Sequence, residues 1–360
     1  MKQKIEKEKL ILLTGGGTIG SVTPLLAIVE ILRSQKIATG FLWLGTANGP
    51  ERQLVTEAGI PFQAISGGKL RRYLSFQNIQ DSWRVMLGFF QAYQYLKDYR
   101  PKLVLTAGSF VSVPVVWAAK ILGIPVIIEQ LDYRAGLANR LMAPVAKQIL
   151  VTFAKSSQDY GRKAVWLGAP VNPNLLQLII TDSFDWPWSK AERRPTVLII
   201  GGGTGAAAIN DFVNRQLSGL IKIANIIHLT GRGKAVATAQ EHYCPVEFFN
   251  QSQMKMAYAA ADLVVARAGL GTLIELAALK KISIIIPIPN SHQVDNAQAV
   301  APAVAAIVDQ EKELANGGLV KLISRVLSDS KKQAEVVSNW PRVIKIANEN
   351  EIATIFKRYL

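Results

Sequence analysis

Two glycine-rich segments are the first candidates for chemistry in this 360-residue sequence. Gly15–Gly20 reads GGGTIG and fits the pattern G-x-G-x-x-G, while Gly201–Ala206 reads GGGTGA and fits G-x-G-x-x-A. Glycines let the backbone approach a phosphate closely, and the N-terminus of a following helix adds amide donors and a partial positive charge. A single such segment can also be a plain tight turn. Two copies, each directly after an apolar run, favour phosphate-binding loops.

The residues that follow these loops exclude the commonest nucleotide-cofactor sites. A dinucleotide-binding domain carries an acidic residue at the end of its second strand, about 20 residues beyond the glycines, which binds the ribose hydroxyls. The second apolar segment of each half ends instead in Gly45-Thr46 and in Thr230-Gly231, without a carboxylate. Neither loop has the Gly-Lys-Ser or Gly-Lys-Thr triplet of a P-loop ATPase. We therefore expect no NAD, FAD or other bound cofactor.

A third candidate, Ala266–Glu275, lies between an apolar run and a helical pattern. Its glycines, the hydroxyl of Thr272 and a helix N-terminus could hold a diphosphate, and Glu275 could accept hydrogen bonds from ribose hydroxyls. The competing interpretation is a capping box, in which Thr272 and Glu275 bond to the first amides of their own helix. Both interpretations stand at this point.

A dense polar cluster, Pro287–Asn296, comes after the next apolar run. Sugar recognition needs hydrogen-bond donors and acceptors in fixed positions, and Gln293, Asp295 and Asn296 supply both. A plain polar loop is the alternative.

Metal and disulfide chemistry find no support in the sequence. His228, His242 and His292 have no ligand spacing with one another or with Cys244, so we expect no zinc site. Cys244 is the single cysteine of the chain, which excludes an intrachain disulfide and fits a reducing cytoplasm.

The net charge of +15 suits an anionic partner, either nucleic acid or an acidic membrane face. No nucleic-acid recognition motif occurs, so we expect no nucleic acid. The first ten residues lack the apolar core of a signal peptide, and no segment reaches the roughly 18 apolar residues of a membrane span. These features predict a cytosolic protein. The alternative to an anionic partner is an ordinary solvated surface in a basic proteome.

The elements that position these residues alternate between strand and helix. In the first half we expect strands at Leu10–Leu13, Thr39–Leu44, Leu103–Thr106 and Pro125–Ile128, with helices at Pro24–Ser34, Glu51–Ala58, Gln77–Asp98 and Pro114–Leu122. In the second half we expect strands at Thr196–Ile200, Asn225–Leu229, Leu263–Ala266 and Ile282–Ile288, with helices at Met254–Ala260 and Gly271–Leu279. Short apolar strands between helices indicate parallel sheets that are covered on both faces.

The two halves are separated by a polar, proline-broken stretch near residues 182–195. We therefore predict an α/β protein with two Rossmann-like domains whose sheets face each other across a cleft. The expected bounds are 1–170 for the first domain, 171–195 for the linker, 196–340 for the second domain, and 341–360 for a C-terminal helix that packs back on the first domain. Ligands of such sheets bind beyond the carboxyl ends of the strands.

A series of short motifs in fixed order resembles the family of lipid II-forming UDP-N-acetylglucosamine transferases of peptidoglycan synthesis. The match runs from Leu10 to Ala299. The motifs are Gly15–Gly20, Gly108–Pro114, Gly123–Gln130, Gly136–Asn139, Gly168–Val171, Gly201–Gly205, Arg267–Glu275 and His292-Gln293 with Asn296. The resemblance implies a GT-B fold and an inverting, metal-independent transfer of N-acetylglucosamine onto a polyprenyl-diphosphate-linked N-acetylmuramyl-peptide, at the cytoplasmic face of the plasma membrane.

The resemblance also assigns residues to the donor and the acceptor. It places uracil on the backbone of Phe249, the ribose on Glu275 and the sugar on Gln293. The full donor set is Thr18, Gly20, Gly203, Thr204, Phe249, Leu270, Gly271, Thr272, Glu275 and Gln293. The acceptor diphosphate is expected near Gly17, Arg134, Asn139 and Asn172.

A basic and apolar stretch, Lys69–Phe76, corresponds to the patch through which the family docks on the anionic inner leaflet. Its candidate membrane residues are Leu70, Arg71, Arg72 and Tyr73. The following helix adds large apolar residues, and the alternative for its Trp83, Phe89 and Phe90 is a place in the core.

Three positions depart from the family pattern on the acceptor side. Ser21 stands where the family has a histidine that could act as general base, and a serine hydroxyl cannot take a proton from a sugar hydroxyl near neutral pH. The family's Glu-Gln-Asn segment reads Glu129-Gln130-Leu131-Asp132-Tyr133-Arg134 here, with an extra residue before Gly136. The arginine of the family's Pro-Val-Arg is Asn172. We expect Asp132 to replace the missing base and Arg134 the missing cation. A different acceptor lipid, a catalytically impaired relative and a UDP-N-acetylglucosamine epimerase remain as alternatives.

Overall fold

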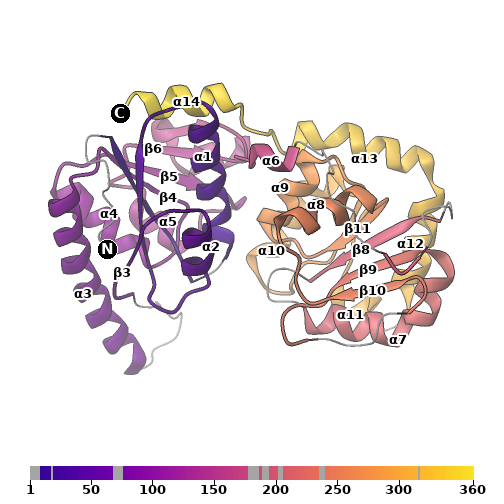
Figure 1. Ribbon diagram of the computed structural model, residues 1–360. Coiled ribbons are helices and arrows are strands. Elements are labelled where there is room, and N and C mark those ends of the chain that lie inside the picture. The colour runs from indigo at the N-terminus through magenta and orange to yellow at the C-terminus, as the bar shows by residue number, and fades with distance from the viewer. Residues whose placement is uncertain are drawn as a thin grey trace. The chain divides into compact units, whose positions relative to one another are not determined.

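The computed structural model describes residues 9–17, 19–67, 76–176, 186–188, 194–201, 206–234, 240–314 and 317–360. These fall into two α/β units (Figure 1). The first unit comprises residues up to Pro173 together with Lys345–Leu360, and the second comprises Asn174–Ile344.

The first unit is built on a parallel sheet of seven strands in the order β3-β2-β1-β4-β5-β6-β7. The central strands are buried along their whole length, as expected for a sheet with helices on both faces. The strands are β1 (Leu10–Thr14), β2 (Gly40–Gly45), β3 (Phe62–Ala64), β4 (Leu103–Thr106), β5 (Val126–Gln130), β6 (Gln148–Val151) and β7 (Ala164–Trp166).

Helices cover this sheet, and one core cluster packs α3, α4 and α5 against it. The helices are α1 (Thr23–Ser34), α2 (Glu51–Glu57), α3 (Phe76–Tyr99), α4 (Ser112–Ile121) and α5 (Leu137–Met142), with short 3-10 turns η1 (Ile19–Ser21), η2 (Ala154–Asp159) and η3 (Gly161–Lys163). Helix α6 (Pro173–Leu176) begins at the last residue of the first unit before the C-terminal return and continues into the second unit. Right-handed crossovers place α1 on the face opposite α4 and α5, because the chain leaves the middle of the sheet in opposite directions after β1 and after β4.

The C-terminal segment belongs to the first unit. Ala169 donates its N–H to the carbonyl of Lys345 at 2.8 Å and accepts from Ala347 at 2.9 Å, which adds a short parallel bridge after β7. Gly168 is required here, because a Cβ at this position would collide with the Lys345 carbonyl. Helix α14 (Glu349–Lys357) then packs against α1 (Figure 1).

The second unit has a parallel sheet of six strands in the order β10-β9-β8-β11-β12-β13. Its strands are β8 (Thr196–Ile200), β9 (Asn225–Leu229), β10 (Tyr243–Val246), β11 (Leu263–Ala266), β12 (Ser283–Ile285) and β13 (Ala306–Ile307). Its helices are α7 (Ala207–Ile223), α8 (Gln251–Ala260), α9 (Leu270–Ala278), α10 (His292–Val300), α11 (Gln310–Glu313), α12 (Gly318–Ser328) and α13 (Ser330–Val343), with the turn η4 (Ala301–Ala303).

In both sheets the order in which successive strands are added reverses at one place. Ligands of doubly wound sheets bind beside such a reversal. The reversal lies between β1 and β4 in the first unit and between β8 and β11 in the second. The two glycine-rich segments follow β1 and β8, and Arg267–Gly269 follows β11. The topology therefore brings the second glycine-rich segment and the start of α9 to the same edge of one sheet.

Helix α3 presents large apolar side chains to solvent. Trp83 and Phe90, for which a place in the core was the alternative, are 62% and 61% exposed, so that alternative is wrong for both. Phe89 is half-buried and packs against the core, as the alternative had it. Among the described helices, none combines the length and the apolar character needed to cross a membrane.

Candidate active site

The N-terminus of α9 forms an open, uncapped helix end in the second unit. Its N-cap is Gly269, which has no side chain to accept a hydrogen bond from the first amides. A Cβ added at Gly269 or at Gly271 would meet no atom within 4 Å, so the space beside these residues is open. Thr272 in the first turn is half-buried. Free amides and the positive end of the helix dipole make this end suitable for a phosphate.

Glu275 lies one turn further along α9 and is held by a tyrosine. The hydroxyl of Tyr258, on α8, donates to Glu275 Oε2 at 2.7 Å. The capping-box interpretation is therefore wrong, because the helix begins at Leu270 and Glu275 lies too far along it to reach the N-cap. Oε1 of Glu275 has no partner among the described residues, which leaves it available to a ligand.

Burial and the hydrogen bond act in opposite directions on this carboxyl. Burial raises the pKa of Glu275 above its usual value, and the bond from Tyr258 lowers it. The pKa of Tyr258 is raised well above its usual value by burial and by the neighbouring Glu275 charge, so its hydroxyl stays protonated and remains a donor.

Gln293 and Asn296 lie on α10 and differ in burial and in hydrogen-bond partners. Gln293 is half-buried, and its Oε1 accepts from the N–H of Ile288 at 3.2 Å. Its Nε2 has no partner within the described chain, so that amide group can donate to a ligand. Asn296 is fully buried and donates to the carbonyl of Ala268 at 3.4 Å, which ties α10 to the segment before α9.

Arg267 holds the loops around this site together. Its buried guanidinium donates to the carbonyl of Ile286 at 3.0 Å and also reaches the side chain of Gln310. Burial lowers the pKa of Arg267 from its usual value. The residue therefore links the ends of β11 and β12 to α11.

Phe249 lies in the loop before α8 with its side chain buried. The ring of Trp186 meets it edge-on, with 6.5 Å between centroids. The side chain of Phe249 is thus taken up by packing within the second unit.

In the first unit, the glycine-rich loop after β1 is tied down on three successive residues. Trp43 Nε1 donates to the carbonyl of Gly15 at 3.0 Å, and Ser109 Oγ donates to the carbonyl of Gly16 at 2.7 Å. The N–H of Gly17 donates to Oε2 of Glu51 at 3.1 Å. Gly17, expected near the acceptor diphosphate, therefore has its amide engaged by a carboxylate of the chain.

Gln130, at the end of β5, organises the loop that contains Asp132. Its Nε2 donates to the carbonyls of Asp132 and Arg134 at 2.7 and 3.2 Å. Its Oε1 accepts from Asn139 Nδ2 at 2.7 Å and from the hydroxyl of Tyr160 at 2.8 Å. Asn139, expected at the diphosphate, is buried and supports Gln130 instead of facing solvent.

Two domain models of one protein family match the sequence of this chain. Residues 11–151 match the glycosyltransferase family 28 N-terminal domain, and residues 196–353 match the C-terminal domain of the same family. The chain belongs to glycosyltransferase family 28.

Relatives of this family 28 chain align with it over nearly its whole length, through both domains. A curated protein of Lachnoclostridium phytofermentans, named UDP-N-acetylglucosamine--N-acetylmuramyl-(pentapeptide) pyrophosphoryl-undecaprenol N-acetylglucosamine transferase, is 36% identical over 92% of this chain and 94% of its own length. The crystal structure of Acinetobacter baumannii MurG aligns with a TM-score of 0.72 at 24% identity, over 97% of this chain and 99% of that one. The UDP-GlcNAc 2-epimerase of Methanocaldococcus jannaschii shares the fold at 15% identity, with a TM-score of 0.63 over 97% and 99% of the two chains. The two-domain GT-B fold is thus shown, and fold alone does not separate transferases from epimerases.

Two acidic residues with different environments lie at the end of β5 and just beyond it in this family 28 chain. Glu129, next to Gln130, is fully buried, and neither carboxyl oxygen has a hydrogen-bond partner among the described residues. Burial raises the pKa of Glu129 well above its usual value, which favours its protonated form. Asp132 is only half-buried, and Ser21, in η1, is buried.

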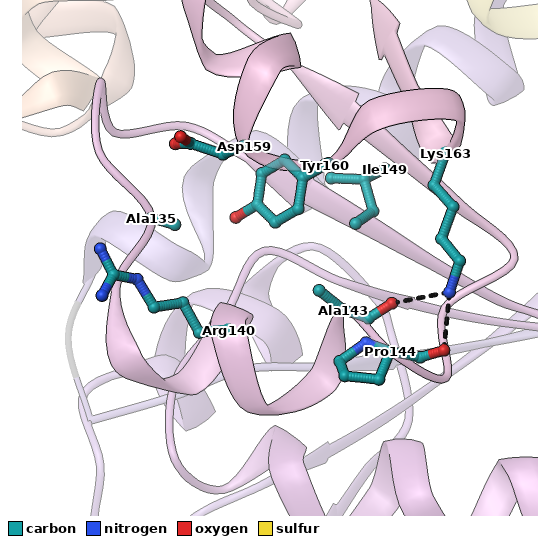
Figure 2. A pocket seen from close by; sticks show the side chains of 8 residues that line it. All are labelled: Ala135, Arg140, Ala143, Pro144, Ile149, Asp159, Tyr160 and Lys163. Carbon is teal, nitrogen blue, oxygen red and sulfur yellow. Dashed lines mark hydrogen bonds between the residues drawn. The ribbon is translucent and has the colours of Figure 1, made fainter.

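A hollow of about 450 Å³ lies beside the Gln130 network. Figure 2 shows the ring of Tyr160 within it, with Arg140 and Asp159 around the same hollow. Lys163 is engaged at its wall, where its Nζ donates to the carbonyls of Ala143 and Pro144 at 3.0 and 2.6 Å. Because Tyr160 bonds to Gln130, this hollow adjoins the supports of the Asp132 loop.

Several expected site residues lie outside the described residues, namely Thr18, Leu70, Arg71, Arg72, Tyr73, Gly203 and Thr204. Gly20 is exposed in η1, Leu270 is buried in α9, Arg134 is exposed, and Asn172 is half-buried. Within the described parts of the chain, no group of three or more His, Cys, Asp or Glu residues could hold a metal ion.

Sequence reasoning missed the supporting residues Tyr258, Arg267 and Gln130. Tyr258 lies at a buried position of a predicted helix, and an aromatic residue at such a position is normally interpreted as part of the hydrophobic core. Arg267 and Gln130 occur inside the motifs of the resemblance, but nothing in their spacing indicates which carbonyls they reach. A charged or amide residue inside an apolar strand-end motif was the signal available for both.

Proposed function

We propose that this chain transfers N-acetylglucosamine from UDP-N-acetylglucosamine to a polyprenyl-diphosphate-linked N-acetylmuramyl-peptide, with inversion at the anomeric carbon. The observation that carries the proposal is the 36% identity, over 92% of the chain, to a transferase named for this reaction. The uncapped start of α9, with Glu275 behind it, supplies the matching donor chemistry.

The donor binds through three groups of the second unit. The diphosphate accepts hydrogen bonds from the backbone amides at the start of α9. The ribose hydroxyls donate to Glu275, and the sugar accepts a hydrogen bond from Gln293 Nε2. The helix end also stabilises the negative charge that develops on UDP as the bond to the sugar breaks.

The acceptor reacts through a sugar hydroxyl. The hydroxyl oxygen attacks the anomeric carbon from the face opposite UDP, its proton passes to a base, and UDP leaves with the bonding electron pair. Asp132 is the base, since Ser21 cannot accept the proton and Glu129 is fully buried, which favours its protonated form. Gln130 holds the Asp132 loop in position through its two bonds to the loop carbonyls.

The test is an acceptor assay with radiolabelled UDP-N-acetylglucosamine and the N-acetylmuramyl-pentapeptide lipid. The wild type should move label into the lipid fraction, and Asp132→Asn should collapse this transfer while still binding UDP. Turnover of Asp132→Asn at the wild-type rate would remove Asp132 as the base. Donor binding without transfer to any lipid would favour an impaired relative, and lipid-independent conversion of the sugar would favour an epimerase.

We further propose that the chain docks on an anionic membrane through the exposed face of α3. Trp83, Met86, Leu87 and Phe90 are all exposed, and their spacing places them on one side of the helix. Helix α4, which packs against α3, adds exposed Trp117 and Ile121. Apolar insertion combined with the net charge of +15 suits an acidic bilayer surface.

Vesicle co-sedimentation checks this docking surface. The double variant Trp83→Ser with Phe90→Ser should bind anionic vesicles at least about tenfold more weakly than the wild type. Val337→Ser, which removes an exposed apolar side chain from α13, is the matched control and should bind normally. Unchanged binding of the double variant would assign docking to another face.

A further inference from the structure

Glu51 is a buried carboxylate at the first glycine-rich loop. It is the first residue of α2 and is fully buried. Its Oε2 accepts from the N–H of Gly17 at 3.1 Å, and its Oε1 accepts from the N–H of Thr46 at 2.7 Å and from the hydroxyl of the same threonine. Three donors thus converge on one anion inside the loop.

Two glycines make room for this carboxylate. A Cβ at Gly16 or at Gly49 would collide with the carboxyl group of Glu51. Gly17 adds the positive φ of +77° that turns its N–H toward the carboxylate. The close approach that a glycine-rich loop offers to a phosphate is therefore used here by a side chain of the protein.

We propose that Glu51 is the built-in anion of the first glycine-rich loop and acts as a positioning residue for transfer. Its carboxylate accepts a hydrogen bond from an amide of the loop, as a phosphate does in a nucleotide-binding loop. With Trp43 and Ser109 it fixes the backbone immediately before η1, which carries Ser21. The kinetic part of this inference rests on the transfer reaction proposed above.

The loop needs the negative charge as well as the shape. Loss of the carboxylate leaves the amides of Gly17 and Thr46, whose hydrogen bonds are part-buried, without the charged acceptor that holds them. A glutamine of the same size presents an NH₂ group to one of these N–H donors, so it cannot restore both bonds.

Chemical rescue separates an anion slot from a general packing role. In Glu51→Ala the slot is empty, and formate should bind there and restore transfer, whereas Glu51→Gln fills the slot and should not respond. Transfer by either variant should fall by about tenfold or more in kcat, with UDP affinity unchanged because the donor amides lie in the other unit. Glu57→Ala, which removes an exposed glutamate of the same helix, should behave as wild type with and without formate.

A second readout does not depend on the reaction. Formate should raise the melting temperature of Glu51→Ala and leave that of Glu57→Ala unchanged, even if the wild type transfers to no acceptor that is tried. Wild-type kcat in Glu51→Gln, or a formate response no larger in Glu51→Ala than in Glu57→Ala, would overturn the inference. If Glu51→Ala does not fold even in formate, the kcat and UDP affinity of Glu51→Gln decide the matter.

Discussion

At the scale of single residues, Glu275 depends on a partner from another helix. Its position and chemistry could be read from the sequence, because a carboxylate one turn into a helix after a glycine-rich turn is suited to ribose. The hydrogen bond from Tyr258 could not be predicted, because it joins α8 to α9 and the residue spacing within either helix does not indicate it. The same holds for Gln130, whose four bonds depend on how a loop folds back.

The Tyr258–Glu275 bond makes a prediction for donor binding. Glu275→Ala should abolish measurable UDP binding, because the ribose acceptor is gone. Tyr258→Phe should weaken UDP binding by about tenfold, the usual effect of losing one bond to a charged group. Because the Tyr258 bond lowers the pKa of Glu275, its loss raises that pKa further, so the deficit should be larger near about pH 6 than near about pH 8.

Isothermal calorimetry with UDP measures these affinities. Tyr359→Phe, which removes a tyrosine hydroxyl in the first unit, is the matched control and should bind as wild type. Unaltered UDP affinity in Glu275→Ala would refute the donor-site assignment.

At the scale of elements, the strand Asn225–Leu229 was predicted correctly although it contains a histidine. His228 is fully buried, and its two ring nitrogens lie 3.0 Å from the Tyr243 hydroxyl and 3.2 Å from Asn210 Oδ1. The strand forms because the histidine is satisfied by β10 on one side and α7 on the other. The strand itself could be predicted from its sequence. Its contacts with β10 and α7 could not, because they depend on side chains from three separate segments of the chain.

The buried His228 predicts acid sensitivity of the second unit. Burial lowers the pKa of His228 from 6.5 to about 4. Between these values the unfolded chain binds a proton that the folded chain excludes, so the unfolding free energy decreases as the pH falls from about 6.5 to about 4. The full contribution is present above the unfolded pKa and amounts to about 3 kcal/mol. Tyr243 does not compensate, because burial raises its pKa to about 12.

Urea unfolding of the second unit across this pH range checks the prediction. His228→Gln should be less stable at neutral pH and should lose most of the pH dependence, whereas the exposed His292→Gln should keep it. An unchanged slope in His228→Gln would assign the acid sensitivity to other groups.

At the scale of the whole molecule, the repeated order of strand, glycine-rich turn and helix was enough to predict two parallel α/β units. Five strands were not predicted, namely β3, β6, β7, β10 and β13. They have two to four residues, which is too few to show a clear hydrophobic pattern. The C-terminal helix was expected to pack back on the first domain, but which element of that domain receives the apolar face of α14 could not be read from its own sequence. The structure supplies it, since the chain returns past Ala169 and α14 packs on α1.

This return predicts that the far end of the chain stabilises the first unit. Phe356 on α14 is fully buried, and its truncation to alanine should lower the unfolding free energy of that unit by about 3–5 kcal/mol, through lost burial and a residual cavity. Hydrogen–deuterium exchange should then show faster exchange in β1, β4 and β5, with no change in β8, β9 and β11. Lys357→Ala removes the exposed neighbour and should leave both units protected. Equal protection of β1 in Phe356→Ala and the wild type would mean that α14 contributes little to the fold, and faster exchange in β8 would mean that it supports the second unit as well.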